Sequence, residues 1–282
     1  MTLHRIIGIH GVGNKPVKPR LAGWWREAIG EGLARNLGRP AAAFELDLVY
    51  WADVMYPTPL DLDPEPYVAA SGTGPLSRHQ ASLTDGVRER AQGALDKLTA
   101  IPKVDLVTQE VMSRTTPDLH RYYTDAAARA KLRGLLSDAL AAAHRDGRRI
   151  MVVAHSMGSI VAFDVLAAMT RAGSPIRIEH LVTVGSPLGL HEVKQQARVQ
   201  GLPIKVPDVV EHWTNHADRR DRVALDSRLA TDYAANASGL TITDMLVVNG
   251  YVRPDGKANP HKIYGYLRAP ELTEIAARLI AT

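Results

Sequence analysis

The stretch Arg148–Phe163, RRIMVVAHSMGSIVAF, decides the fold. It begins as a short apolar run rich in valine, which is typical of a strand buried on both faces. It ends in an apolar pattern with helical periodicity, and Ser156 lies between the two halves. A reactive serine must stand on a sharp turn, which requires very small residues two positions away on either side, and Ala154 and Gly158 meet this demand. The stretch therefore has the pattern of a nucleophile elbow between a strand and a helix.

A structural interpretation of the same stretch has to be weighed against this one. Serine is a favoured N-cap and glycine is favoured at turns, so many α/β proteins contain such a strand-to-helix junction. If Ser156 is reactive, its place at a helix start brings backbone N–H groups and the positive helix end close to any oxyanion formed there. Residues elsewhere in the chain must decide between the two interpretations.

Composition indicates one globular α/β domain that carries an insertion. The chain has 282 residues, of which 45% are hydrophobic and 23% are charged, and its formal net charge is +4. The basic residues are spread thinly, which is typical of solvated surfaces, so no nucleic-acid partner is expected. The chain has no cysteine, which excludes disulfides, thiolate catalysis and zinc–thiolate sites.

The first residues run directly into what looks like a core strand, Arg5–Ile9. No charged segment followed by an apolar stretch and a small-residue cleavage site precedes that strand. No apolar run approaches the length needed to cross a bilayer, so no stable membrane anchor is expected. The sequence thus favours a cytoplasmic location.

Strands alternate with helices along most of the chain, which predicts a mainly parallel sheet of about six strands. The spacing predicts helices over Leu21–Leu37 and Asp125–His144, a helix after the elbow, and one at the C-terminus. Besides the elbow strand, the predicted strands are Arg5–Ile9, Phe44–Trp51, Ile178–Val184, Val209–His216 and Leu240–Val248. The predicted fold class is therefore α/β.

Residues 53–124 interrupt this rhythm. Their first part is rich in proline and acidic residues, and their second part is moderately helical over about Ser82–Ile101 and Val104–Met112. A structureless segment of this length is uncommon inside a compact domain, so the segment is predicted to form a lid or cap. The alternative is a packing appendage with no gating role.

The first strand is followed by a glycine-rich loop within Gly8–Lys15, GIHGVGNK. The loop resembles a P-loop but departs from it: an extra residue precedes Lys15, no Ser or Thr follows, and Pro16 and Pro19 defer the helix. The dinucleotide-binding pattern fails because its third glycine is missing. A His-Gly pair after the first strand can instead leave a backbone N–H free for a substrate oxyanion. We interpret His10 as a hydrogen-bond donor that fixes this loop.

A serine hydroxyl needs a base beside it and a third group that orients the base. In a parallel sheet the loops at the carboxyl ends of the strands converge at one edge. These loops supply Asp221 after the fifth predicted strand and His261 after the sixth. The chain order Ser156, Asp221, His261 is that of α/β-hydrolases.

Taken together, these pieces resemble the α/β-hydrolase superfamily, and within it the lipase-like bacterial serine esterases. Ala154 replaces the first elbow glycine, a change common in the lipase branch. The resemblance covers nearly the whole chain outside the insertion. The matching pieces are His10–Gly13, Val153–Ser159, Val182–Pro187, Asp221–Ala224, and His261 with Tyr264 and Leu267.

The resemblance implies a role for each matching residue. Ser156 would attack an acyl carbonyl, His261 would take its proton and pass it to the leaving group, and Asp221 would orient the imidazole. The oxyanion hole would be formed by the N–H of Met157 and that of Val12 or Gly11, each donor contributing roughly 3–4 kcal/mol in the transition state. No cofactor is implied.

Several neighbouring residues remain as alternatives. Asp218 lies in the same loop as Asp221 and could be the acid. His212 and His216 could be bases, or could form a metal site with the two aspartates, but they lie within a predicted strand and are interpreted as structural. No metal is expected. His155 is interpreted as a packing residue.

The sequence thus predicts a cofactor-free serine hydrolase, a carboxylesterase or lipase, whose partner is a small-molecule acyl ester. Thioester, amide and lactone substrates pass through similar chemistry, as does acyl transfer to an acceptor other than water. A non-catalytic binding protein that has kept the fold is the alternative from a different class. The oligomeric state is not predicted.

Overall fold

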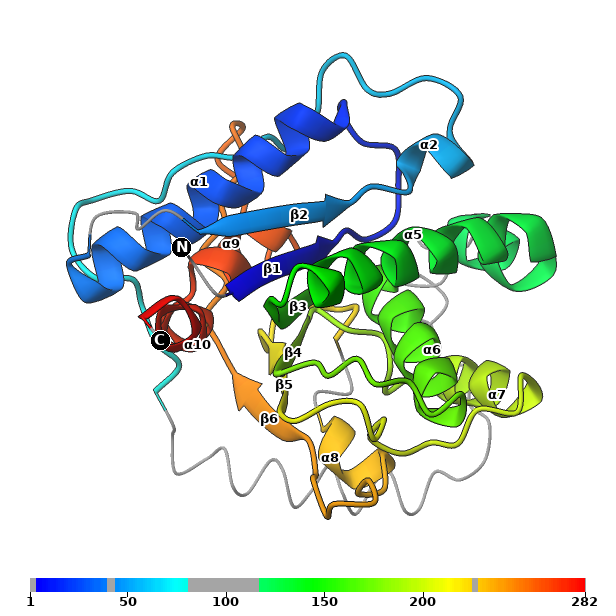
Figure 1. Ribbon diagram of the computed structural model, residues 1–282. Coiled ribbons are helices and arrows are strands. Elements are labelled where there is room, and N and C mark those ends of the chain that lie inside the picture. The colour runs from blue at the N-terminus through cyan, green and yellow to red at the C-terminus, as the bar shows by residue number, and fades with distance from the viewer. Residues whose placement is uncertain (1–3, 40–43, 81–116, 225–227, 282) are drawn as a thin grey trace, which may run out of the picture.

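The structure is a computed structural model that describes residues 4–39, 44–80, 117–224 and 228–281 (Figure 1). The helical segments predicted over about Ser82–Ile101 and Val104–Met112 lie outside these ranges. Two helical layers enclose one central sheet (Figure 1). None of the described helices is both long enough and apolar enough to cross a membrane.

The sheet has six strands, and every pair of neighbouring strands is parallel. This confirms the predicted α/β class and makes the sheet wholly rather than mainly parallel. The spatial order is β2-β1-β3-β4-β5-β6. The strands are β1 (His4–Ile9), β2 (Glu45–Val49), β3 (Arg149–His155), β4 (His180–Val184), β5 (Trp213–Ala217) and β6 (Thr243–Leu246).

Helices cover both faces of the sheet (Figure 1). One layer consists of α1 (Lys18–Leu37), α9 (Ile263–Arg268) and α10 (Pro270–Ala281), which contact one another. The opposite layer is built on α5 (Ala126–Arg145) and α6 (Met157–Arg171), with α7 (His191–Val199) beside them. The short helices are α2 (Ala52–Met55) and α8 (Leu229–Asp232), and residues 117–124 are also helical.

The central strand β3 shows why the sequence folds in this way. Its side chains alternate between the two cores: Val152 faces the α5/α6 layer, whereas Met151 and Val153 face the α1/α9/α10 layer. A strand that is buried on both faces needs apolar residues at consecutive positions. The continuous apolar run before Ser156 therefore places β3 in the middle of the sheet.

Several predicted boundaries are wrong: β6, for example, spans Thr243–Leu246 and not Leu240–Val248, and β4 begins at His180 and not at Ile178. Helix α1 begins at Lys18 and not at Leu21, because Pro19 lies in the first turn, where its missing N–H has no intrahelical partner to lose. Strand β5 begins at Trp213 and not at Val209. The Val210 N–H bonds to Pro207 O at 3.1 Å, which forms a turn that delays the strand.

The described parts of the predicted insertion pack against both helical layers. Residues 56–80 form no regular element and run along α1, where the Tyr67 hydroxyl donates to Glu31 at 3.0 Å. Residues 117–124 lie against the other layer, where the Tyr122 hydroxyl donates to Asp164 at 2.6 Å. Because all six strands are parallel, the loops after β1, β3, β5 and β6 meet at one edge of the sheet.

Candidate active site

Ser156 stands at the junction of β3 and α6 in a strained conformation. Its φ and ψ are 52° and −129°, and it is the one non-glycine residue with positive φ among the residues that the structure describes. Such a conformation costs about 1–3 kcal/mol and is found mainly where function requires it. The Ser156 N–H donates to Val184 O at 3.1 Å, which anchors the turn to β4. The local geometry is that of a nucleophile elbow.

The small residues around the serine are required by close packing. A Cβ on Gly158 would lie 2.6 Å from the Ile9 carbonyl oxygen, so only glycine lets α6 approach β1. A Cβ on Gly11 would lie 2.7 Å from the Ser156 Cβ. The loop after β1 therefore passes directly against the serine, as the oxyanion interpretation requires.

His261 and Asp221 continue the chain of hydrogen bonds from the serine. His261 Nε2 lies 3.1 Å from Ser156 Oγ, and His261 Nδ1 lies 2.9 Å from Asp221 Oδ2. Because the ionised carboxylate is only an acceptor, Nδ1 carries the proton and Nε2 is left to accept from the serine hydroxyl. The Asp221 side chain is 0% exposed and that of His261 is 25% exposed. The base is thus reachable, whereas its orienting acid is shielded.

Gly185, in the loop after β4, makes room for this pair. Its φ is 54°, and a Cβ there would lie 2.9 Å from Asp221 Oδ2 and 3.1 Å from His261 Nδ1. A larger residue would push the imidazole and the carboxylate apart. Gly185, the first residue of the Gly185-Ser186-Pro187 turn, therefore contributes to the site because it has no side chain.

Asp218, the alternative acid, binds other groups. Its carboxylate accepts from Arg220 Nη2 and from the Asn249 N–H, both at 2.7 Å. Burial opposes the ionisation of Asp218, but the hydrogen bonds from Arg220 and Asn249 outweigh it and hold its pKa below the ordinary value. Among the two aspartates, the structure places Asp221 on His261 and gives Asp218 a role in fixing the loop.

The loop after β1 is held by His10. His10 Nδ1–H donates to Gly11 O at 2.9 Å, and Nε2 accepts from the Trp51 N–H at 3.1 Å. Burial, reinforced by the nearby Lys15 ammonium, lowers the pKa of His10 to about 3, so the ring stays neutral in this tautomer. Its position matches the predicted loop-fixing donor.

Backbone N–H groups in this loop divide into engaged and available ones. The Gly13 N–H donates to Asp118 at 2.7 Å. Over the described ranges of the chain, the N–H groups of Gly11 and Val12 have no hydrogen-bond partner. Met157 follows the serine as the first residue of α6. The donors named from sequence thus flank Ser156, and two of them are uncommitted.

A pocket of about 250 Å³ opens at this point. Ser156 and His261 line it, with apolar walls from residues such as Trp25 and Leu60. Four charged side chains also line the pocket, two basic and two acidic. Lys262 Nζ lies 3.6 Å from both Asp63 Oδ2 and Glu65 Oε2, so these three charges are paired with one another. The fourth is Lys15.

The structure also reveals supporting residues that sequence reasoning missed. The Tyr266 hydroxyl donates to Asp221 Oδ2 at 2.6 Å and accepts from the Asp218 N–H at 3.1 Å. His155 Nε2–H donates to the His261 carbonyl at 2.8 Å, and burial lowers the pKa of His155 well below its ordinary value. Neutral His155 therefore positions the backbone of the base, which is more specific than the packing role inferred from sequence.

His212 and His216, the alternative bases, are not among the residues that line this pocket. His216 is fully buried within β5, and His212 precedes that strand. Burial lowers the pKa of His216 to about 3, so it stays neutral. The described residues contain no group of three or more His, Cys, Asp or Glu side chains that could hold a metal ion.

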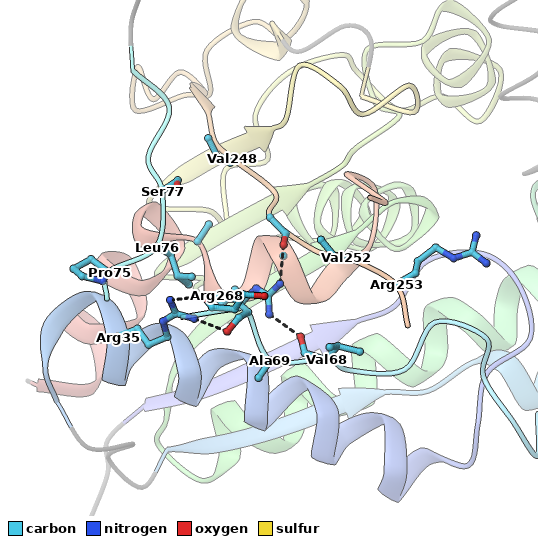
Figure 2. Close-up of a pocket in the computed structure, with 15 residues that line it drawn as sticks. Arg35, Val68, Ala69, Pro75, Leu76, Ser77, Val248, Val252, Arg253 and Arg268 are labelled. Atoms are coloured by element: carbon cyan, nitrogen blue, oxygen red, sulfur yellow. Dashed lines mark hydrogen bonds between the residues drawn. The ribbon is translucent and has the colours of Figure 1, made fainter. Parts of the chain in front are cut away.

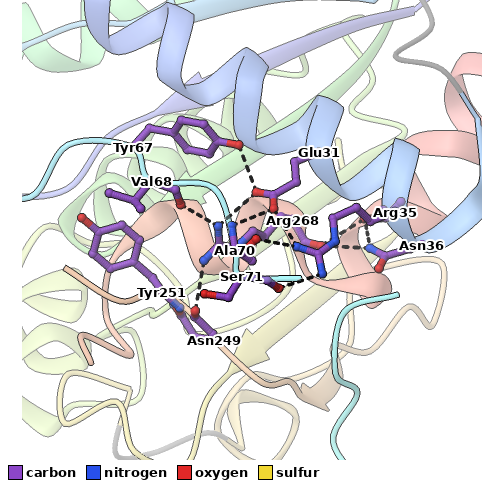
Figure 3. Close-up of polar contacts among 12 residues, drawn as sticks. Glu31, Arg35, Asn36, Tyr67, Val68, Ala70, Ser71, Asn249, Tyr251 and Arg268 are labelled. Atoms are coloured by element: carbon purple, nitrogen blue, oxygen red, sulfur yellow. Dashed lines mark hydrogen bonds and ion pairs between the residues drawn. The ribbon is translucent and has the colours of Figure 1, made fainter. Parts of the chain in front are cut away.

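A second cavity, of about 400 Å³, is lined in part by Arg268 at the end of α9 (Figure 2). Two of the arginines in its lining are engaged with the protein itself. Arg268 donates to Glu31, Val68 O and Gly250 O, and Arg35 donates to Glu31 and to backbone carbonyls of residues 70–74 (Figure 3). These contacts tie residues 67–74 to α1 and α9.

The fold and the elbow define a hydrolase-type α/β protein of the α/β-hydrolase superfamily. Residues 114–256, just over half of the chain, match the family model described as the PGAP1-like alpha/beta domain, so the chain belongs to this family. The matched part contains Ser156 and Asp221, whereas the loop after β1 and His261 lie outside it. No curated protein sequence matches the chain.

Proposed function

We propose that this protein is a serine hydrolase that cleaves carboxylic esters, with Ser156 as nucleophile, His261 as base and Asp221 as the orienting acid. One observation carries the proposal: an unbroken hydrogen-bond chain from Asp221 through His261 to a serine held at positive φ. A structural N-cap serine needs neither the strained backbone nor a histidine on its hydroxyl.

The reaction would proceed in two steps through an acyl-enzyme. Ser156 Oγ adds to the ester carbonyl while His261 Nε2 takes the hydroxyl proton, and that proton then passes to the departing alkoxide. The second step repeats the sequence with water, so that the carboxylic acid leaves and Ser156 regains its proton. The N–H groups of Met157 and of Val12 or Gly11 would stabilise the negative charge on the carbonyl oxygen in both steps.

The pocket favours a neutral substrate with a modest acyl group. Its charges are paired within the protein, as Lys262 lies between Asp63 and Glu65, and its remaining walls are largely apolar. We propose a carboxylesterase- or lipase-like specificity on this basis. That residues 53–124 act as a lid on a single domain, and that the protein is cytoplasmic, stay predictions.

Labelling with a fluorophosphonate probe tests the proposal. The wild type is expected to react covalently, and Ser156→Ala and His261→Ala are expected to lose labelling, because the probe requires an activated serine. His191→Ala, an exposed histidine at the start of α7, serves as the matched control and should label like the wild type. Release of nitrophenol from short and long acyl esters then ranks acyl-chain preference.

Three outcomes would contradict the proposal in whole or in part. Folded wild type that neither labels nor hydrolyses any ester would favour the non-catalytic binding protein. Faster product formation when alcohols are added, with the acyl group recovered on the alcohol, would favour an acyltransferase. A preference for thioesters over matched oxygen esters would change the substrate class while leaving the three residues in place.

A further inference from the structure

We propose that Lys15 is a positioning residue for the oxyanion-binding loop, and that its ammonium group holds the peptide units that follow Val12 in the orientation the reaction needs. The inference rests on the proposed function, because it assigns a task to a residue that supports the same site. Lys15 lines the pocket but makes its hydrogen bonds to its own loop.

The geometry carries the proposal. Lys15 Nζ donates to Val12 O, to Gly13 O at 2.8 Å and to Asn14 O at 3.5 Å. An ammonium group has three N–H donors, so all three are committed. Three successive carbonyls therefore converge on one cation, and none of its donors remains for an anionic substrate.

Carbonyls that face Lys15 force the corresponding N–H groups to point away from it. In a trans peptide the C=O and the next N–H point in opposite directions, and the described residues contain no cis peptide bond. The peptide that carries Val12 O also carries the Gly13 N–H, which donates to Asp118 at 2.7 Å. Asp118 is itself fixed by the Tyr56 hydroxyl at 2.6 Å.

Val12 is consequently clamped on both sides. His10 holds the carbonyl of the preceding peptide, and Lys15 with Asp118 holds the following one. With both peptides fixed, the Val12 N–H, which has no hydrogen-bond partner in the part of the chain that the structure describes, has one direction available beside Ser156. Oxyanion donors act strongly only when they are preorganised, since a shift of about 1 Å can cost about 100-fold in rate.

The surroundings of Lys15 make this clamp sensitive to pH. Burial, reinforced by repulsion from Lys262, lowers the pKa of Lys15 to about 8, although nearby carboxylates oppose the shift. The neutral amine has two N–H donors and a lone pair that would face a carbonyl, so the clamp should weaken as the proton is lost. The groups that face Lys15 are Lys262, Asp63, Asp118, Glu65, and the neutral rings of His10 and His155.

The test compares Lys15→Met, Lys15→Arg and the control Lys18→Met in the full chain. Lys18 is an exposed lysine three residues away, so its loss changes the charge without touching the clamp. The measurements are kcat and KM for a nitrophenyl ester between about pH 6 and 10, with thermal unfolding followed in parallel.

We expect Lys15→Met to lower kcat about 10- to 100-fold with KM changed less than about 3-fold, because only the transition state needs the aligned donors. Wild-type kcat should fall above about pH 8 as one proton is lost from Lys15. Lys15→Arg keeps its charge in this range, so it should recover part of kcat and remove the alkaline fall. A purely structural lysine would move the unfolding temperature and leave the pH profile alone.

Several results would overturn the proposal. Wild-type kcat that stays level from about pH 7 to 10 would do so even if Lys15→Met failed to fold. The proposal would also be wrong if Lys15→Met had the kcat of the wild type, including the case in which only its KM increased. If the wild type and Lys15→Met labelled equally fast with fluorophosphonate, the proposal for Lys15 would be wrong while the proposed function would stand. Wild type that does not label would remove the proposed function together with it.

Discussion

The two cavities that α9 lines differ in how far their polar groups are already engaged in hydrogen bonds. The larger one, of about 400 Å³, has Arg268 in its wall, and that side chain is 2% exposed and bound to Glu31 and two carbonyls. The smaller one, of about 250 Å³, contains the Ser156 and His261 pair and lies beside backbone donors of the β1 loop that have no partner among the residues the structure describes. The larger volume therefore does not identify the cavity that can carry out a reaction.

A single short helix serves both cavities. Ile263 and Tyr264 line the smaller one, Gly265 and Arg268 line the larger one, and the Tyr266 hydroxyl donates to Asp221. A cavity whose polar groups satisfy one another stabilises the fold, whereas a cavity with unsatisfied, preorganised groups can act on a substrate. Substitutions in the two cavities should therefore separate activity from stability.

The largest effect is expected from Asp221→Asn. The asparagine keeps the shape of the acid but favours the wrong tautomer of His261, and in serine proteases the equivalent change lowers kcat about 10,000-fold. We expect a loss of that order, with KM little changed and the unfolding temperature close to that of the wild type. Steady-state kinetics with a nitrophenyl ester measures it.

Asp218→Asn is the matched comparison within the same loop. It weakens contacts to Arg220 and to the Asn249 N–H, so it should lower the free energy of unfolding. We expect kcat to fall by less than about 10-fold. If Asp218→Asn were the more damaging variant for kcat, the acid would have to be reassigned.

Local sequence signals were sufficient for the elbow and most of the sheet. The β3 run, the flanking Ala154 and Gly158, and the apolar periodicity of α6 all act within a few residues of Ser156, so pattern and structure agree. The choice between Asp218 and Asp221 was not readable. It depends on a turn in which the Asp221 N–H bonds to Asp218 O at 2.9 Å, and this turn decides which carboxylate reaches the histidine.

The supporting residues could not be predicted because their contacts span long distances in the sequence. Asp118 meets Gly13 across 105 positions, and Tyr266 meets Asp221 across 45. Neither residue belongs to a motif, and each is an ordinary polar or aromatic residue of a helix. Lys15 was noticed only as part of an incomplete phosphate-binding pattern, whereas the structure shows its ammonium turned back onto its own loop.

An intermediate effect, on stability, is expected from Arg268→Met. It leaves the Glu31 carboxylate buried without its main cation, and breaking a buried pair in this way costs about 3–5 kcal/mol. Because Arg35, Tyr67 and the Ala70 N–H still bind Glu31, we expect the lower end of that range in the free energy of unfolding. Denaturant unfolding measures it, and kcat per labelled active site should stay within about 3-fold of wild type.

Arg78→Met is the control for this variant. Arg78 pairs with Glu274 on the surface, where both side chains are more than a third exposed, and its second contact, to Glu271 Oε1, is long at 3.9 Å, so its loss should cost about 1 kcal/mol or less. Equal costs for the two variants would mean that the network in the larger cavity contributes no more than a surface pair. A large fall in kcat for folded Arg268→Met would mean that the two cavities are not independent.

The smallest effect is expected from Tyr266→Phe, a substitution in the helix that lines both cavities. It removes one of the donors that hold the Asp221 carboxylate, while His261 and the Val223 N–H continue to hold it. One hydrogen bond to a charged group contributes about 1.5–3 kcal/mol, and only part of that is felt at the serine, so we expect kcat to fall about 10-fold.

Tyr123→Phe is a fitting control for this substitution, because it removes a buried hydroxyl that has no partner among the described residues. Its kcat should match the wild type. A Tyr266→Phe loss as large as that of Asp221→Asn would make the tyrosine as necessary as the acid. No loss at all would show that the backbone turn and the histidine hold Asp221 by themselves, and that α9 supports the active site through packing alone.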